Sequence, residues 1–408
     1  MSGEAILAYA DTLEEELVAI RRDLHRHPEL LYDVHRTAAK VAGLLEEWGL
    51  EVRRGVGRHF GMGVVGILRG RAEGRTVLLR ADMDALPIQE ENDAAYKSRH
   101  EGVMHACGHD AHTAMLLGAA KALSRFREEL RGTVKFVFQP AEEGARPVPE
   151  DGRLLSGGRN MIEDGILEGV DAGYAFHVWP ELPIGTVGVH RQYAMAASYH
   201  FTVQFHGVTG HHSTPHQAVD AIVMAAQFIG EIKVAMSTEL NPMEPAVLSY
   251  GTLRAGSAHN AIADHAVLTG TFRAFDKETI LRIVHALEHR AGAVAASFGG
   301  RSDVRLREGT PLRNDPRAVR QVQAAGAKVF GEANTLLLDA PSLAGEDFAW
   351  YLERIPGAFV FIGAGNAERG IVHPVHHPRF DVDERVLAYG AKLHIQLARQ
   401  ALEEDWTN

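Results

Sequence analysis

The sequence predicts an α/β protein in which a larger domain with a mainly parallel sheet is interrupted by a smaller α+β domain. Strand-like and helix-like runs alternate up to about residue 190, which is typical of a parallel sheet. The pattern changes to strands of period two near residue 195, and the alternation resumes after residue 310. A chain of 408 residues is long for one core. We therefore expect the larger domain at 1–193 and 309–408, and the inserted domain at 194–308.

The elements of the larger domain follow from the spacing of apolar residues. Val41, Leu44 and Leu45 recur at helical spacing, and the proline after His27 separates this helix from the one before it. Continuous apolar runs predict strands that are buried on both faces. The predicted helices are 11–25, 34–48, 110–124 and 384–402; the predicted strands are 63–68, 76–80, 133–139, 171–178 (ending at His177) and 358–363, and 144–158 is predicted as a loop.

The smaller domain opens with a strand that has one wet face. Phe201, Val203 and Phe205 alternate with polar residues, which is the period of a strand. The elements expected after it are a helix at 216–236, strands at 246–254 and 266–275, a helix at 277–298 and a strand at 303–307. This β-α-β-β-α-β order is that of a ferredoxin-like unit.

Composition excludes several classes of protein. The formal charge of −11, from 42 basic and 53 acidic residues, disfavours a nucleic-acid partner. The single cysteine cannot form an internal disulfide, which fits a reducing compartment. The acidic, amphipathic start does not resemble a signal peptide, and no apolar run approaches the length of a membrane span. We expect a cytoplasmic protein with no membrane partner.

Polar clusters with metal or proton-transfer chemistry follow several predicted strands. In open α/β sheets the ligand site lies beyond the carboxyl ends of the strands, so these clusters are expected to meet. Together they predict a metallohydrolase. The clusters are Asp82 and Asp84, Cys107 and His109, Glu142 and Glu143, His177, and His376 with His377.

Each of the first two clusters has a structural alternative. Asp82 and Asp84 lie two apart, so both side chains project to one face and can orient a metal-binding histidine, although aspartates also end strands in turns. Cys107 and His109 supply the thiolate and imidazole that zinc and similar metals favour. A lone cysteine is often a small buried hydrophobe, but the nearby His105, His109 and His112 favour metal binding.

The acidic pair allows a division of labour. One glutamate can bind a metal while the other takes a proton from water. An exposed acidic turn is the alternative, but the apolar Phe136–Phe138 run before Glu142 and Glu143 disfavours it. His177 ends a strand, and His376 lies in a loop where a histidine has no evident structural duty. Residues 210–216 (GHHSTPH) suit a binding loop, or a cap for the helix that follows.

Motifs along the chain resemble those of the N-acyl-amino-acid amidohydrolases. This group includes hippurate hydrolases, aminoacylases and auxin-conjugate hydrolases, within the dinuclear metallo-aminoacylase and carboxypeptidase family. The motifs run in family order from residue 21 to residue 381: RRDLHRHPEL, LLRADMDALPI, MHACGHDAHTAMLLGAA, FVFQPAEEG, GYAFHVWP, GHHSTPH, HNAIAD, GTFRAFD, GEDFAWY and VHHPRFD.

The resemblance implies a role for each motif. Two divalent metal ions per subunit, of zinc, manganese, cobalt or nickel, would be bridged by Cys107. The resemblance implies that Asp84 orients the metal ligands from behind. It also implies that Asp82 takes the place of a histidine ligand of distant relatives. It implies His109 and His177 as ligands of one metal, Glu143 and His376 of the other, Glu142 as general base and proton donor, His211 in a lid as oxyanion donor, and Asn260 and Arg273 as substrate-carboxylate ligands.

The reaction implied is hydrolysis of an N-acyl amino acid to a carboxylate and a free amino acid. A dipeptidase or carboxypeptidase of the same family is the alternative, because the same catalytic set would serve. A metal-storage protein would not need Glu142, and a cysteine-nucleophile hydrolase would leave the acidic pairs unexplained. The resemblance further implies a homodimer or homotetramer formed through the lid.

Overall fold

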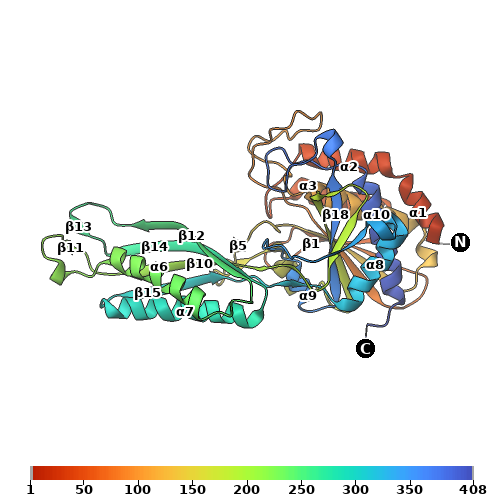
Figure 1. Cartoon of the computed structure of the whole chain (residues 1–408). Helices are drawn as coiled ribbons and strands as arrows, with labels where there is room; N and C mark the ends of the chain where they lie inside the picture. The colour runs from red at the N-terminus through yellow and green to blue at the C-terminus, as the bar shows by residue number, and fades with distance from the viewer. Residues whose placement is uncertain (1–2, 407–408) are drawn as a thin grey trace. The chain divides into compact units, whose positions relative to one another are not determined.

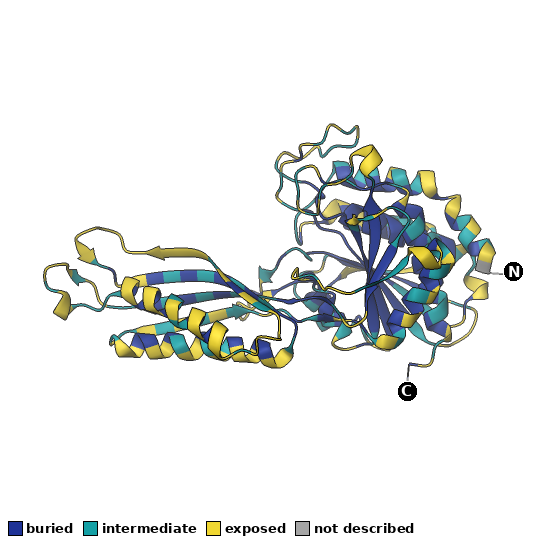
Figure 2. Cartoon of the chain, in the orientation of Figure 1, coloured by how far each residue is buried: buried dark blue, intermediate teal, exposed yellow. Residues whose placement is uncertain are grey.

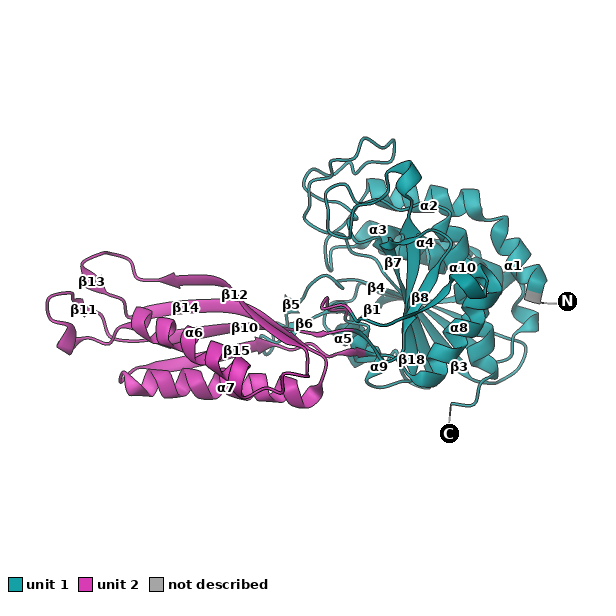
Figure 3. Ribbon diagram, in the orientation of Figure 1, with its two compact units in different colours: residues 1–194, 313–341, 347–408 teal, residues 195–312, 342–346 magenta. Residues whose placement is uncertain are grey.

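The computed structural model describes residues 3–406, which form two compact units (Figure 3). Met1–Ala194, Arg313–Pro341 and Asp347–Asn408 belong to the larger unit, and Met195–Leu312 with Ser342–Glu346 to the smaller. The chain therefore leaves the larger unit and returns to it.

Within the described residues, the larger unit contains an eight-stranded sheet in the order β1-β2-β4-β3-β7-β18-β8-β17. Figure 1 labels β1 and β18 of this sheet. The pairs β3–β4, β3–β7, β7–β18 and β8–β17 are parallel, whereas β1–β2, β2–β4 and β8–β18 are antiparallel. The predicted mainly parallel sheet is confirmed. Its strands are β1 Glu51–Val56, β2 Gly63–Arg69, β3 Thr76–Asp82, β4 Thr133–Gln139, β7 Ala172–Pro183, β8 Val187–His190, β17 Thr335–Leu338 and β18 Gly357–Gly365.

Helices pack against this sheet because its strands are apolar on both faces. Leu78 and Leu79 of β3 point to opposite faces and both are fully buried. Figure 2 shows the strands of this sheet coloured mainly as buried. The main core joins the sheet to helices on one of its faces. The helices of the larger unit are α1 Gly3–Asp11, α2 Glu14–Arg26, α3 His35–Glu47, α4 His109–Arg125, α5 Gly157–Glu163, α8 Pro316–Phe330, α9 Ala349–Leu352 and α10 Val386–Glu403.

Three local predictions need correction. The helix expected at 11–25 begins three residues later, as α2 at Glu14, because a turn at Thr12 separates it from α1; the Thr12 hydroxyl donates to the carbonyl of Tyr9. The loop at 144–158 contains a short pair of strands and the start of α5. The strand predicted to end at His177 continues to Pro183, because β18 pairs with it along that length.

The short strands are β5 Arg146–Pro147, β6 Leu154–Leu155, β9 Tyr193–Met195 and β16 Leu312–Arg313.

The smaller unit is an antiparallel sheet with two helices on one face. Among the described residues its four main strands follow the order β12-β14-β10-β15, the arrangement expected of a ferredoxin-like unit. The alternate residues Phe201, Val203 and Phe205 are buried against the helices. The elements are β10 Ala197–His206, β11 Gly210–His211, α6 Ala221–Thr238, β12 Ala246–Ala255, β13 Ala261–Ile262, β14 His265–Ala274, α7 Lys277–Ser297 and β15 Arg301–Arg307.

Helix α6 begins five residues later than the sequence pattern indicates. Residues Pro215–Gln217 form a separate 3-10 turn, and Asp220 caps α6 by accepting from the amides of Ile222 (2.9 Å) and Val223 (3.2 Å). Among the described residues, α6 is the one helix whose length and mean hydropathy (1.3) would suit a membrane span, and a third of it is buried inside the fold.

Candidate metal centre in the larger unit

The carboxyl ends of three neighbouring strands bring the chemical side chains together. Strands β4 and β7 each pair with β3 in parallel, so all three strands end at the same edge of the sheet. Asp82 and Asp84 follow β3, Glu142 and Glu143 follow β4, His177 lies in β7, His109 begins α4 just after Cys107, and His376 lies in the loop after β18.

Five predicted ligands form two groups that share one thiol. The donor atoms of Cys107, His109 and His177 lie within 4.8 Å of one another, and so do those of Cys107, Glu143 and His376. Cys107 Sγ is 3.3 Å from His177 Nε2, and Glu143 Oε1 is 3.3 Å from His376 Nε2. This arrangement suits two metal ions with Cys107 between them.

The unsatisfied donors of this cluster fit metal ligation. Three buried atoms of this cluster have no hydrogen-bond partner among the described residues. They are the two ring nitrogens of His109 and Glu143 Oε1. Buried polar atoms without partners are costly, and a bound cation would satisfy Glu143 Oε1 and one of the two ring nitrogens of His109. Sulfur, imidazole nitrogen and carboxylate oxygen together are the ligand set of zinc and related divalent metals.

Burial controls the protonation of the ligands. It raises the pKa of the Cys107 thiol well above its usual range, with nearby carboxylates adding to the effect, so a metal must displace that proton. Burial also lowers the pKa of His177 well below its usual value, which leaves a neutral imidazole. For His109, burial opposes the charged form, but Asp82 and Asp84 outweigh it and raise the pKa to about 10.

A buried network holds the ligands from behind. The amide of Val178 donates to His112 Nε2 (2.9 Å), so His112 carries its proton on Nδ1 and donates it to Asp82 Oδ1 (2.7 Å). Arg80 donates to the other oxygen, Asp82 Oδ2, also at 2.7 Å. Asp82 is thus fixed beside His109, with its Oδ2 3.7 Å from His109 Nε2, and its donor atom lies within 4.8 Å of those of His109 and His112.

Asp84 holds the turn that carries the glutamate pair. Its two carboxylate oxygens accept from the backbone amides of Glu142 (2.9 Å) and Glu143 (3.2 Å). The preceding Ala141 has φ +50°, a conformation that costs energy for a residue other than glycine. The bonds from Asp84 help to keep this strained turn in place.

The structure places His376, and not His377, beside Glu143. His376 has φ +66°, and this left-handed backbone lets its ring reach Glu143. The ring of His377 instead stacks on that of His373, with centroids 4.3 Å apart and planes 5° apart.

The remaining predicted residues, His211, Asn260 and Arg273, belong to the smaller unit. His211 of β11 contacts Ser213 (2.7 Å), and Asn260 lies next to it, before β13. Arg273 is eight residues beyond His265 on β14, roughly 26 Å along an extended strand. One small carboxylate therefore cannot touch both Asn260 and Arg273 of the same copy.

Asp347 lies beside Glu142 but is not among the site residues predicted from the sequence. Its backbone amide donates to Glu142 Oε1 (3.3 Å), while its carboxylate accepts from Arg80 (2.9 Å) and from the amide of Gly158 (2.8 Å). The motif GEDFAWY contains this residue, but spacing alone does not indicate that it reaches Glu142. The buried Arg80 in the otherwise apolar TVLLRA run was the available signal.

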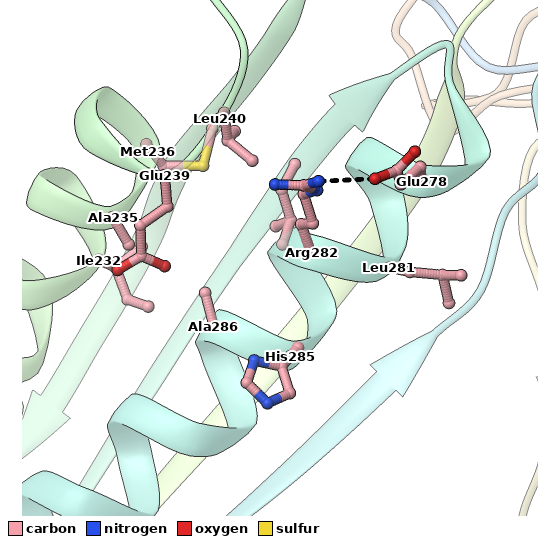
Figure 4. Close-up of a pocket in the computed structure, with 11 residues that line it drawn as sticks. Ile232, Ala235, Met236, Glu239, Leu240, Glu278, Leu281, Arg282, His285 and Ala286 are labelled. Atoms are coloured by element: carbon pink, nitrogen blue, oxygen red, sulfur yellow. Dashed lines mark hydrogen bonds and ion pairs between the residues drawn. The ribbon is translucent and has the colours of Figure 1, made fainter.

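An apolar hollow of 320 Å³ lies between α6 and α7 (Figure 4). Met236, Leu240 and Leu281 line it beside the ion pair of Arg282 and Glu278. The described residues that line it include no predicted site residue, so this hollow is separate from the metal centre.

The chain is similar to a described protein family and to curated proteins along most of its length. The model of peptidase family M20/M25/M40 matches residues 78–400. The chain is 37% identical to an N-acetyl-L-cysteine deacetylase of Bacillus subtilis (97% of this chain, 90% of that protein) and 36% identical to thermostable carboxypeptidase 2 of Saccharolobus solfataricus (95% of each).

A solved structure of a dinuclear metal-binding peptidase of the M20 family, from Bacillus subtilis, is similar throughout. Its TM-score is 0.81 at 34% identity, and the match covers 97% of this chain and 99% of that one. The resemblance seen in the motifs is thereby confirmed. Since the family model covers most of the sequence and relatives above 30% identity cover nearly all of it, the chain belongs to peptidase family M20/M25/M40.

Proposed function

We propose that this protein hydrolyses the amide bond of N-acyl amino acids to a carboxylate and a free amino acid. Membership of the family makes it a metal-dependent hydrolase of linear amides. The observation that carries the finer proposal is the pair of ligand groups sharing Cys107, with Glu142 directly beside them. The relative named N-acetyl-L-cysteine deacetylase supports an N-acyl substrate.

Five residues would hold two divalent metal ions. His109 and His177 would bind one ion, Glu143 and His376 the other, and Cys107 both. Such ions, when bound, lower the pKa of water and polarise a carbonyl oxygen. The thiolate and imidazoles suit zinc, while manganese, cobalt and nickel remain candidates because availability also decides occupancy.

Glu142 would act as the general base and then as the acid. Its carboxylate lies with His109 and Glu143 in a third group of donor atoms within 4.8 Å, so it can reach the same water molecule. The amide of Asp347 orients its Oε1. Glu142 would take a proton from the attacking water and pass it to the leaving nitrogen.

The smaller unit would act as a lid and a dimerisation unit. His211 would donate to the oxyanion, and Asn260 and Arg273 would bind the substrate carboxylate. Because Asn260 precedes His265 and Arg273 lies roughly 26 Å beyond His265 along β14, we propose that two copies contribute to each site. Strand β12 is an edge of its sheet, and α6 exposes Ile222, Val223 and Val234, which supports a homodimer through this unit.

A dipeptidase or carboxypeptidase activity is the second candidate. The relative named thermostable carboxypeptidase 2 favours it, and the same ligand set would serve. A cytoplasmic location remains part of the proposal, supported by the single unpaired Cys107.

The test is release of free amine from a panel of N-acyl amino acids and plain dipeptides. Chelator-treated protein should be inactive and should regain activity with zinc, manganese, cobalt or nickel. Turnover of N-acyl amino acids above dipeptides supports the proposal, and the reverse order moves the assignment to the peptidase. Full activity after exhaustive chelation would contradict the metal-dependent mechanism.

A further inference from the structure

A buried arginine interrupts the apolar run of strand β3. Arg80 is only 1% exposed, although the four residues before it in the strand are Thr76, Val77, Leu78 and Leu79. Burying a guanidinium is costly unless carboxylates and other acceptors surround it. Apolar residues of similar volume often stabilise a core as well as a buried ion pair does, so the arginine points to a role beyond packing.

The guanidinium of Arg80 joins two carboxylates that lead to different parts of the site. Its Nη1 donates to Asp82 Oδ2 (2.7 Å), and its Nη2 donates to Asp347 Oδ1 (2.9 Å). Asp82 lies beside His109, and the backbone amide of Asp347 donates to Glu142 Oε1 (3.3 Å). One rigid, planar group therefore links a proposed metal ligand to the proposed general base.

The carboxylate of Asp347 is also held by other donors of the larger unit. Gln139 Nε2 donates to Asp347 Oδ1 (2.8 Å), and the backbone amide of Gly158 donates to Asp347 Oδ2 (2.8 Å). Asp347 is the residue at which the chain re-enters the larger unit after residues 342–346. These bonds therefore fix the position of the returning backbone, including the amide that faces Glu142.

Position 158 has no room for a side chain beside this carboxylate. A Cβ at Gly158 would lie 2.8 Å from Asp347 Oδ2 and 3.0 Å from Asp347 Cγ, with the ring of Tyr351 next at 3.1 Å. The aspartate side chain is short and is held by hydrogen bonds, so it would have to move to admit a methyl group. An alanine at this position is thus a probe aimed at Asp347.

We propose that Arg80 is a positioning residue with two arms, one that places Glu142 through Asp347 and one that places His109 through Asp82. The inference rests on the proposed function, in which Glu142 is the general base and His109 a metal ligand. Arg80 itself reaches the reaction only through these carboxylates. A misplacement of about 1 Å can cost about 10²-fold in rate, so a shared clamp for base and ligand has a kinetic consequence.

The first test measures kcat at saturating metal, KM and metal affinity, with the N-acyl amino acid that the wild type hydrolyses fastest. Gly158→Ala disturbs the Asp347 arm and should lower kcat about tenfold, with KM and metal affinity unchanged. Arg80→Lys keeps the charge but loses the planar fork, so it should lower kcat and also weaken metal binding about tenfold. The control is Gly43→Ala in α3, whose Cβ would meet nothing within 4 Å and which should change none of these values.

Asp347 offers a graded pair of variants. Asp347→Ala removes the bonds of the carboxylate but keeps the backbone amide, so its loss of kcat reports displacement of that amide. Asp347→Asn keeps an oxygen that can accept from Arg80 and Gln139, and it should retain more of the wild-type kcat than the alanine variant. Equal losses in the two variants would contradict the clamp.

The second test follows hydrogen exchange in the metal-free protein and needs no turnover. Mass spectrometry measures the protection of the peptide that contains the amide of residue 347. Gly158→Ala and Asp347→Ala should exchange faster there, whereas Gly43→Ala should match the wild type. Thermal unfolding shows whether each variant is folded.

The results separate the positioning role from a structural one. Wild-type kcat in Gly158→Ala, or a loss of metal from that variant as large as its loss of kcat, would overturn the two-arm role. Faster exchange at residue 347 with unchanged kcat would overturn it as well. Unchanged exchange in an active protein would sink this inference alone, whereas faster exchange in a protein that hydrolyses no substrate of the panel would sink the proposed function too.

Discussion

Glu142 and Glu143 have the same chemistry and adjacent positions, but different surroundings. Glu143 Oε1 faces His376 at 3.3 Å, and the histidines outweigh burial to lower the pKa of Glu143, which keeps it ionised as a ligand should be. Glu142 Oε1 instead accepts from the amide of Asp347, within a group that includes His109. The neighbours of the two glutamates, rather than the residue type, are the basis for proposing Glu143 as ligand and Glu142 as base.

Replacing Glu142 by glutamine should remove turnover without removing metal. The expected loss in kcat is about 10²–10⁴-fold, the usual contribution of a general base. Metal content, measured by elemental analysis after dialysis, should equal that of the wild type. The matched variant E143Q should lose metal as well as activity. Near-normal turnover in E142Q would rule out this assignment.

His376 and His377 provide a second matched pair. His376→Ala should weaken binding of one of the two metal ions by at least about tenfold, because it removes a direct ligand. His377→Ala should leave metal affinity unchanged, because its ring stacks on His373 instead. Titration of metal into chelator-treated protein measures both. Equal losses in the two variants would contradict the geometry.

At the scale of elements, the ends of strands and helices are held by specific acceptors. Asp84 accepts from two amides of the turn after β4, Asp220 caps α6, and Asp383 accepts from Asn366 and Arg385 just before α10. These side chains satisfy backbone or cationic donors that would otherwise be left without protein partners. These hydrogen bonds fix the conformation of the loops that carry the site.

Removing the cap of α6 should destabilise the smaller unit. Asp220→Ala is expected to lower its free energy of unfolding by about 1 kcal/mol, since two amides lose their acceptor. Asp220→Asn keeps a capping oxygen, so its free energy of unfolding should fall by only about a few tenths of a kcal/mol. Denaturant unfolding of the two variants measures the difference. An Asn variant as unstable as the Ala variant would argue against capping.

Asp383 should make stability depend on pH in the acid range. Its bonds to Arg385, opposed by burial and supported by Asn366, lower its pKa to about 2. A folded-state pKa below the ordinary value means that the stabilisation is present above about pH 4 and is lost as the pH falls towards 2. Asp383→Asn should flatten this part of the stability profile, measured as thermal midpoint against pH. An unchanged slope would show that Asp383 contributes little.

At the scale of the whole molecule, two separate hydrophobic cores divide the chain. One lies between the eight-stranded sheet and its helices, and the other between the smaller sheet and α6 and α7. The metal ligands all belong to the larger unit. Metal should therefore stabilise one unit directly and not the other.

Chelation should lower one thermal transition selectively. A ligand present at 1,000 times its dissociation constant stabilises the folded state by about 4 kcal/mol, so its removal should lower the melting temperature of the larger unit by several degrees. Calorimetry with and without chelator measures the shift. Equal shifts of both transitions would show that the two units unfold together.

Much of this protein could be predicted from local pattern. Continuous apolar runs indicated the buried strands, period two indicated β10, and the clusters at strand ends contained the five residues that the structure brings together in two candidate ligand groups. Where the pattern failed, a local contact decided, as with the turn at Thr12 and the cap at Asp220. Such side-chain hydrogen bonds shift the ends of elements without changing their periodicity.

The sequence by itself determined which residue types could bind metal and which strands would present them, because hydrophobic periodicity and chemical type are local properties. Only the tertiary structure decided that His376 rather than His377 faces Glu143, that Asp347 reaches Glu142, and that Asn260 and Arg273 lie far apart in one copy. These arrangements depend on left-handed backbone, on contacts between residues some 200 positions apart and on strand register. Spacing along the chain does not encode such distances, because packing brings together segments that the sequence keeps apart.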